Sequence, residues 1–327
     1  MMQGKKAMQI YESENSNITL VVIALLSVYI FWGGTYLGMK VAIETIPPFI
    51  MAGIRFFVAG TVLYVLARLK GEQHPSVAEW KGAGIVGALL LLGGNGLVAW
   101  AEQKVPSAIA SLLVATVPLW ILAFNWLGGN KKRPALGVLA GVLLGFSGIA
   151  VLVLNTGGAN SQNMDTIGMI ALLIASVSWS IGSLYSRRAK LPASPLQSTA
   201  AQMMVGGALL IFVSFFLDDW TKLHLSELSV RSALALGYLI VFGSIISYTA
   251  YIWLLKNADP AWVSTYAFVN PIVAVFLGWF LANERLSPHA WAAAIIIVVA
   301  VMMITVFGGQ RKAIERKEVV RGEGEGV

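Results

Sequence analysis

The sequence contains no cysteine, only three histidines and few charged residues, and each scarcity excludes a class of protein. Without cysteine the chain has no disulfide framework, thiol nucleophile or thiolate metal site. Charged residues make up 12% of the 327 residues and hydrophobic residues 57%, whereas soluble domains are roughly 25% charged. A soluble globule of this size could not bury so much apolar surface, which argues against a soluble enzyme, a disordered chain and a nucleic-acid-binding protein.

The sequence also lacks the local patterns of common catalytic sites. The histidines are scattered, and no His-Glu-x-x-His, Gly-x-Ser-x-Gly or Walker-type phosphate loop occurs. We therefore expect no enzymatic activity, no bound cofactor and no metal, and ATP does not drive a reaction through this chain.

Long apolar runs are what the sequence does contain. The hydrocarbon core of a bilayer is about 30 Å thick, so a spanning helix needs about 20 apolar residues. Ten such runs, separated by prolines, glycines and charges, predict an all-α integral membrane protein with ten transmembrane helices. The approximate spans of these helices 1 to 10 are 18–39, 49–67, 82–101, 107–127, 135–154, 166–186, 196–217, 232–255, 261–282 and 289–309.

The distribution of lysine and arginine indicates how the helices are oriented. If the N-terminus is cytoplasmic, the cytoplasmic segments hold 17 of the 23 basic residues and the outer segments hold 5. Since cytoplasmic loops carry the excess of positive charge, we expect both termini in the cytoplasm. Residues 311–327 are charged and rich in glycine, so we expect them to form a disordered cytoplasmic tail.

The two halves of the chain share a faint internal repeat. A shift of 147 positions places Trp32 on Trp179, and a shift of 153 positions places Pro118 on Pro271. Each repeat holds five helices, an odd number, so the second copy enters the membrane from the opposite side. Such a 5+5 inverted-topology repeat is typical of secondary transporters, with a cavity between the halves near the midplane. The expected repeats are residues 18–157 and 164–310.

Several short motifs are spread over both halves. They are Trp32-Gly33-Gly34-Thr35-Tyr36, residues 52–60 around Arg55, Gly94-Asn95-Gly96, residues 105–118, Gly243-Ser244, residues 266–271 and Asn283-Glu284-Arg285-Leu286. Together they resemble the EamA-type members of the drug/metabolite transporter superfamily over nearly all of residues 18–310, and most closely a subgroup of inner-membrane exporters.

The resemblance implies a fold, an activity and a site. It implies a 5+5 inverted repeat, a central cavity lined by helices 1, 3, 4, 6, 8 and 9, and movement of small organic solutes. In that family the last helix of each half lies at a dimer interface, so a homodimer is an open alternative. Gly137, Gly141, Gly145 and Gly148 form a stripe on helix 5, for which we expect close helix packing.

Aromatic and polar side chains inside the runs are the candidates for a binding site. Aromatic rings offer apolar area and a negative π face, which suits amphipathic or cationic solutes, and amide and hydroxyl groups orient them. Tryptophan and tyrosine at headgroup depth are the alternative explanation for the same residue types. The predicted substrate-binding residues are Trp32, Tyr36, Asn95, Trp100, Trp179, Ser183, Tyr248, Tyr266 and Asn270.

Charged groups and prolines are the candidates for gating or structural roles. A charge near the centre of a membrane helix costs about 2.5–3.5 kcal/mol, so Arg55 needs a compensating arrangement. It can snorkel outward, pair with Glu44 or Glu102, or bind an anionic group, and its match to the family motif favours a structural or gating role over direct binding. Glu102 is a hypothetical site of proton coupling. Prolines in the middle of helices 4 and 9 each remove a helical hydrogen bond and predict kinks at the site. The predicted gating or structural residues are Lys40, Arg55, Glu102, Pro118, Arg187 and Pro271.

The sequence thus predicts a multi-pass inner-membrane secondary transporter, an exporter of small organic metabolites or drugs that works by alternating access. Its expected partners are a small organic solute and the lipid bilayer, without nucleic acid. An intramembrane lipid-modifying enzyme and a passive channel are the alternatives.

Overall fold

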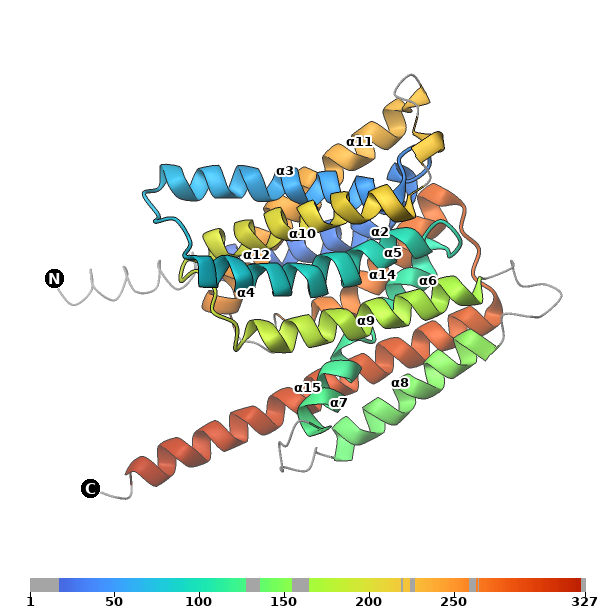
Figure 1. Cartoon of the computed structure of the whole chain (residues 1–327). Helices are drawn as coiled ribbons and strands as arrows, with labels where there is room; N and C mark the ends of the chain where they lie inside the picture. Colours follow the sequence, from blue (N-terminus) through green and yellow to red (C-terminus); the bar gives the residue numbers. More distant parts are fainter. Residues whose placement is uncertain are drawn as a thin grey trace, which may run out of the picture.

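The computed structural model describes residues 18–127, 136–154, 165–218, 220–223, 227–258, 263 and 265–324, and all regular secondary structure in these residues is helical (Figure 1). Within these described residues, seven helices are long and apolar enough to cross a membrane, and three more apolar helices are shorter. The prediction of an all-helical membrane protein is therefore confirmed, while the number of ten spans stays a prediction.

The helices follow the expected apolar runs. The first half comprises Ile18–Ala42, which includes the π-helical turn η1 (Val28–Trp32) and α2 (Gly33–Ala42), then α3 (Pro48–Leu69), α4 (Val77–Gly87), η2 (Ala88–Gly96), α5 (Leu97–Ala101), α6 (Ser107–Val114), α7 (Val117–Leu127) and α8 (Leu136–Leu154). The second half comprises α9 (Thr166–Ser186), α10 (Pro195–Leu217), the short η3 (Trp220–Lys222), α11 (Val230–Tyr238), η5 (Leu239–Ile246), α12 (Ser247–Asn257), α14 (Tyr266–Ala282) and α15 (Pro288–Gly324).

The two halves pack against each other as the internal repeat predicts. Helix 2 (α3) packs on helix 7 (α10), and helix 5 (α8) packs on helix 10 (α15). Helix 1 contacts α11 and η5 of helix 8, just as helix 6 (α9) contacts η2 and α5 of helix 3. Both third helices also carry a π-helical segment, η2 in one half and η5 in the other. In these pairs, equivalent helices of the two halves therefore have equivalent partners, as a two-fold relation between the halves requires.

Helices α3 and α10 run antiparallel, and polar groups join them at both ends. At one end the Asp218 carboxylate, after α10, accepts hydrogen bonds from the backbone N–H groups of Phe49 (3.2 Å) and Ile50 (2.7 Å), at the beginning of α3. At the other end Ser194 Oγ, before α10, donates to Glu72 Oε1, after α3, over 2.7 Å. Equivalent helices of the two halves thus point in opposite directions, as Figure 1 shows for the connections of α3 and α10.

Glycines bring α3 and α10 into backbone contact. A Cβ atom added at Gly207 would lie 2.5 Å from the backbone nitrogen of Phe57, and one added at Gly60 would lie 2.6 Å from that of Met204. No larger residue fits at either position without moving a helix. The pair forms a tightly packed support on one side of the bundle.

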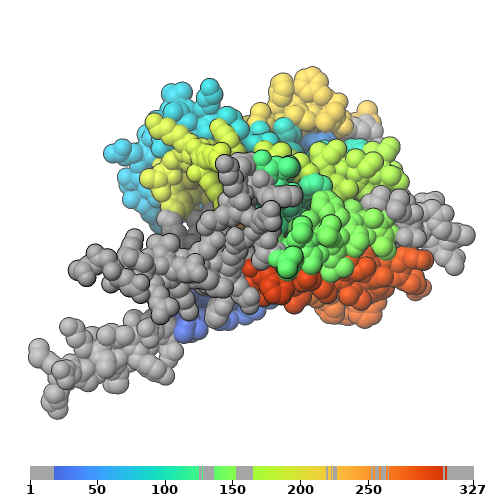
Figure 2. Space-filling model, turned by 90° about the horizontal axis from the view of Figure 1, so that it is seen from below, coloured from blue at the N-terminus to red at the C-terminus, as the bar shows by residue number. Residues whose placement is uncertain are grey.

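The glycine stripe of helix 5 packs within the chain. A Cβ added at Gly141 would lie 2.8 Å from Ile304 Cγ1, and one at Gly148 would lie 2.8 Å from Ile297 Cγ1, both on α15. The expected close packing is thus present, and its partner is the last helix of the same chain. Figure 2 shows the outer surfaces of α8 and α15 side by side on the face seen from below. The homodimer stays an open alternative.

Helix α15 extends beyond its apolar run. Its backbone is helical to Gly324, although we expect disorder from residue 311 onward. Between Ala313 and Val320 the sequence holds good helix formers and alternating charges, which explains how the helix continues. Helix α15 ends, and the first described helix begins, on the same side of the bundle (Figure 1).

Candidate functional site

A cavity of about 130 Å³ lies where the two halves meet. Cavities of comparable volume hold a molecule of the size of benzene. The lining residues come from helices 1, 3, 4, 6, 8 and 9, the set that the family resemblance implies, and also from helix 2. They are Trp32, Thr35, Tyr36, Met39, Arg55, Phe56, Leu91, Gly94, Asn95, Val98, Ser111, Val114, Ala115, Val117, Pro118, Ala175, Trp179, Gly243, Tyr248, Tyr266, Ala267, Asn270 and Pro271.

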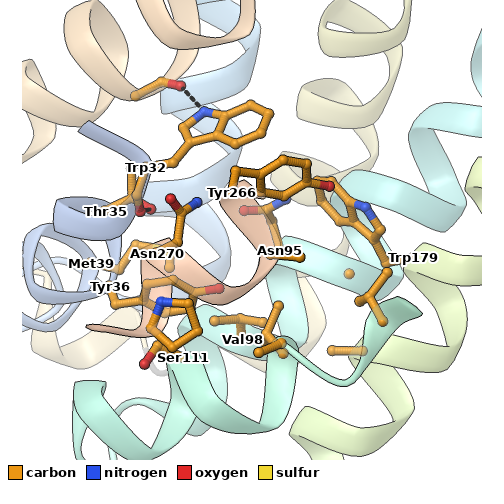
Figure 3. Close-up of a pocket in the computed structure, with 18 of the residues that line it drawn as sticks. Trp32, Thr35, Tyr36, Met39, Asn95, Val98, Ser111, Trp179, Tyr266 and Asn270 are labelled. Carbon is orange, nitrogen blue, oxygen red and sulfur yellow. Dashed lines mark hydrogen bonds between the residues drawn. The ribbon is translucent and has the colours of Figure 1, made fainter. Parts of the chain in front are cut away.

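Trp32 is the centre of an aromatic cluster at one side of this cavity. Its ring centroid lies 5.5 Å from that of Tyr266, 5.9 Å from that of Tyr248 and 5.1 Å from that of Tyr251. The indole N–H donates to the carbonyl oxygen of Gly243 over 2.9 Å, the bond dashed in Figure 3. Because this bond satisfies the only polar atom of the indole, the ring presents an apolar π surface to the cavity.

Trp179 forms the corresponding contact of the second half. A Cβ atom added at Gly94 would lie 2.8 Å from its Cε3 atom, so the indole ring rests on the backbone of η2. Each first-helix tryptophan thus contacts a glycine in the π-helical segment of the other half. Figure 3 shows the ring of Tyr266 between those of Trp32 and Trp179.

The third helix of each half departs from α-helical geometry next to the cavity, through the π-helical segments η2 and η5. A π-helix closes its hydrogen bonds over five residues, and such segments are frequent at functional sites. The amide of Asn95 follows the same spacing, because Nδ2 donates to the carbonyl oxygen of Leu90 over 3.4 Å. Asn95 and the glycines on either side of it thus lie within the π-helical segment η2.

Asn270 brings an unsatisfied polar atom to the cavity. Its side chain is buried, and no described residue donates a hydrogen bond to its Oδ1 atom. A buried amide oxygen without a partner costs about 1–3 kcal/mol. The cavity thus offers an acceptor for an N–H or O–H group of a bound molecule.

The two prolines interrupt their helices differently. Helix 4 is divided, because α6 ends at Val114, α7 begins at Val117, and Pro118 lies in the first turn of α7. Pro271 lies inside α14 without dividing it, five residues after that helix begins at Tyr266. Pro271 therefore lies in the interior of helix 9, where the sequence places it. Proline is tolerated in the first turn of a helix, where Pro118 lies, whereas inside a helix Pro271 leaves the carbonyl oxygen of Ala267 without its usual N–H partner.

Two serines of α9 stabilise the division of helix 4. Ser176 Oγ lies 3.1 Å from the carbonyl oxygen of Leu113 and 2.9 Å from that of Leu172 in its own helix. Ser180 Oγ lies 3.1 Å from the carbonyl oxygen of Val117 and 2.7 Å from that of Ser176, so each hydroxyl shares its one proton between the two helices. Both hydroxyls are fully buried. We did not predict these residues, although their spacing of four places them on one helix face.

Arg55 lines the cavity from α3 and is only 4% exposed. Its Nε donates to Ser244 Oγ over 2.9 Å, and its guanidinium lies 4.6 Å above the ring of Phe56. Among the described residues that line the cavity, it is the only charged one. The sequence favours a structural or gating role for Arg55. Its position in the cavity wall also allows direct contact with a solute.

Lys40 and Glu102 lie next to each other outside the cavity lining. Lys40 Nζ donates to the backbone carbonyl oxygen of Glu102 over 2.5 Å. Glu102 is fully buried, and neither of its carboxylate oxygens has a hydrogen-bond partner in the described part of the chain. This arrangement is compatible with a gate or a proton site, both of which stay predictions.

Three further predicted residues do not line the cavity. Trp100 packs between helices, with Lys104 Nζ 5.6 Å from its ring centroid. Ser183 Oγ donates to the carbonyl oxygen of Trp179 in its own helix over 2.7 Å. Arg187 is exposed directly after α9. The cavity therefore brings together Trp32, Tyr36, Asn95, Trp179, Tyr248, Tyr266 and Asn270 from the predicted binding set, together with Arg55, Pro118 and Pro271.

Glu284 has a structural role that the sequence did not reveal. Its Oε1 accepts from the backbone N–H and the hydroxyl of Ser107, each over 2.9 Å, and its Oε2 accepts from the N–H of Ala108 over 3.0 Å. The carboxylate therefore caps the beginning of α6, where the free N–H groups of a helix favour negative charge. In the sequence, Glu284 stands out only as part of the Asn283-Glu284-Arg285-Leu286 motif after helix 9.

Comparisons with known proteins agree with this architecture. The EamA-like transporter family matches twice, over residues 19–154 and 166–306. The chain is 42% identical over 285 residues to the uncharacterized inner membrane transporter YedA of Escherichia coli K12, covering 86% of this chain and 90% of that one. It is 24% identical over 301 residues to the uncharacterized transporter YoaV of Bacillus subtilis, covering 89% and 99%.

A solved crystal structure superposes with a TM-score of 0.60 at 20% identity, covering 89% of this chain and 98% of that one, and it supports the fold alone. The two family matches cover most of the chain, one in each half, and the similarity to YedA extends over both. The chain therefore belongs to the EamA-like transporter family.

Proposed function

We propose that this protein is a secondary transporter that carries small organic solutes through its central cavity by alternating access. One observation carries the proposal: the cavity is shared by two inverted halves, with first, third and fourth helices of each half contributing to its wall. Two such halves have two equivalent packings, each open to one side of the membrane.

The interrupted helices supply the parts that can move. Helices 1, 3, 4 and 8 contain η1, η2, the division between α6 and α7, and η5, all next to the cavity. The pairs α3–α10 and α8–α15 are closely packed through glycines instead. In the proposed cycle the four interrupted helices bend around the two supporting pairs.

We place the protein in the inner membrane, with both termini in the cytoplasm and export as its direction. The relative YedA is named an inner membrane transporter, and the basic residues favour the cytoplasmic side of this orientation. A green fluorescent protein fused after Val327 should fluoresce, whereas alkaline phosphatase at the same position should be inactive. Active phosphatase would contradict the orientation.

A metabolite comparison tests the function. Cells that overexpress wild type should shift the distribution of at least one organic solute between cytoplasm and medium, and Trp179→Ala should abolish the shift. Trp291→Ala is the matched control, because that side chain is 49% exposed on the outer face of α15. An identical shift with Trp179→Ala would contradict the role of the cavity.

Counterflow in proteoliposomes distinguishes the alternatives. A transporter accelerates uptake of labelled solute when unlabelled solute is enclosed, because the loaded site returns faster than the empty one. A channel shows flux without this stimulation. Turnover of lipid by the purified protein, abolished by a substitution in the cavity, would favour an enzyme.

A further inference from the structure

We infer that the transported solute is an organic anion, and that the Arg55 guanidinium binds its carboxylate or another anionic group inside the cavity. This inference rests on the proposed transport function and names the chemical class of its substrate. It departs from the sequence-based expectation of amphipathic or cationic solutes, which rested on aromatic rings alone.

The charge balance of the cavity carries the inference. Arg55 is nearly fully buried at the cavity wall, and no acidic side chain lines the described part of that wall. No carboxylate of a described residue forms an ion pair with Arg55, and Glu102 acts on it only from a distance. A buried cation without an ion-pair partner is costly, and an anionic solute would neutralise it.

The guanidinium is also held in place with room for a ligand. The bond from Nε to Ser244 Oγ fixes one edge, and the ring of Phe56 supports one face. Nη2 packs against the backbone of Gly243, since a Cβ atom added there would lie 3.0 Å from that nitrogen, and the Arg55 side chain lines the cavity beside this contact. With Nε engaged, the Nη groups are the donors that stay available for an anion.

The rest of the wall fits the body of such a molecule. Trp32 and Tyr266 present aromatic rings 5.5 Å apart, and Trp179 lines the same cavity. The unpartnered Oδ1 of Asn270 can accept a hydrogen bond from an N–H or O–H group of the solute. The expected ligand therefore has an apolar or aromatic body and an anionic group, and a hydrogen-bond donor on that body adds a contact to Asn270 without being required for binding.

A matched series of probes tests the charge preference. Phenylacetate, phenylacetamide and phenethylammonium have nearly the same shape and differ in charge. We expect calorimetric titration of the purified wild-type protein to show phenylacetate binding at least about tenfold more tightly than the other two, as a charge-assisted hydrogen bond predicts. Arg55→Gln should remove this preference, and Arg55→Lys should retain part of it.

Lys104→Gln is the matched control, since it removes one positive charge from an exposed side chain outside the cavity lining. It should leave the preference unchanged. If Arg55→Gln does not fold, Ser244→Ala serves instead, because it removes the hydrogen bond that holds the Arg55 guanidinium in place and should weaken the binding of phenylacetate but not of the other two probes.

Three results would overturn the inference: equal or weaker binding of phenylacetate by wild type, no binding of any probe, or a preference that survives Arg55→Gln. None of them would affect the solute shift and counterflow experiments, which test transport whatever the charge of the solute. A failure of the charge assignment is thus distinguishable from a failure of the proposed function.

Discussion

At the scale of single residues, two glutamates show how much the surroundings decide the role of a carboxyl group. Glu284 accepts three hydrogen bonds at the beginning of α6. Glu102 is fully buried, and both its carboxylate oxygens lack partners among the described residues. An ionised carboxylate without hydrogen bonds is costly in an apolar interior, so Glu102 is the better candidate for a group that takes up a proton.

The same substitution at both positions separates these roles. Glu102→Gln removes a charge that no hydrogen bond compensates, so we expect the Tm of the purified protein to stay the same or rise. Glu284→Gln removes the negative charge and one hydrogen-bond acceptor at the beginning of α6. We expect the free energy of unfolding to fall by about 1–3 kcal/mol and the Tm to decrease. Thermal unfolding in detergent measures both. A larger loss for Glu102→Gln than for Glu284→Gln would contradict this assignment.

At the scale of elements, the π-helical segments connect the sequence pattern to the site. Glycines next to Asn95 predict a loosened third helix, but the exact contact between Gly94 and Trp179 depends on the packing of two helices from different halves. Sequence pattern cannot supply that contact, because the register between the helices is set by side chains far apart in the chain. The division of helix 4 was predictable from Pro118, whereas its stabilisation by Ser176 and Ser180 was not.

Gly94→Ala tests the tight contact. Its Cβ would lie 2.8 Å from Trp179 Cε3, so the ring must move, and overpacking of this kind costs about 1–3 kcal/mol. We expect a lower Tm and loss of solute transport. Gly237→Ala is the control, because an added Cβ there has no atom within 4 Å among the described residues. An equal Tm and equal solute transport in the two variants would show that the contact between Gly94 and Trp179 is unimportant.

The pair of α3 and α10 predicts a pH dependence. Partial burial raises the pKa of Asp218, although the N–H groups of Ile50 and Phe49 oppose the shift. A raised pKa in the folded state means that folding favours the protonated form, so this contribution to stability falls as pH rises from the ordinary range near about 4. Asp218→Asn removes the titration.

We therefore expect the Tm of wild type, relative to Asp218→Asn, to decrease between pH 4 and neutrality. Parallel unfolding curves at several pH values measure the difference. A difference that grows with pH would mean that the two backbone hydrogen bonds outweigh burial.

At the scale of the whole molecule, the apolar runs and the repeat predicted most of the architecture. The all-helical class and the inverted halves follow from the hydropathy pattern and the repeat, and seven residues of the predicted binding set line the cavity. The structure adds helix 2 to the cavity wall, because Arg55 and Phe56 reach it from α3. It also extends α15 to Gly324, where composition alone indicated disorder. Both differences depend on long-range packing or on local helix propensity that a hydropathy pattern does not measure.

The central claim is that the cavity opens in turn to each side of the membrane. The absence of native cysteine makes it testable with one introduced thiol, and Ser111 is suitable because it lines the cavity and is almost fully buried. Val301→Cys, at a fully buried position on α15, is the control that should stay unlabelled from both sides. The decisive measurement is labelling of Ser111→Cys by a membrane-impermeant maleimide in right-side-out and in inverted vesicles. We predict modification in both preparations, whereas modification from one side only, or from neither, would contradict the account.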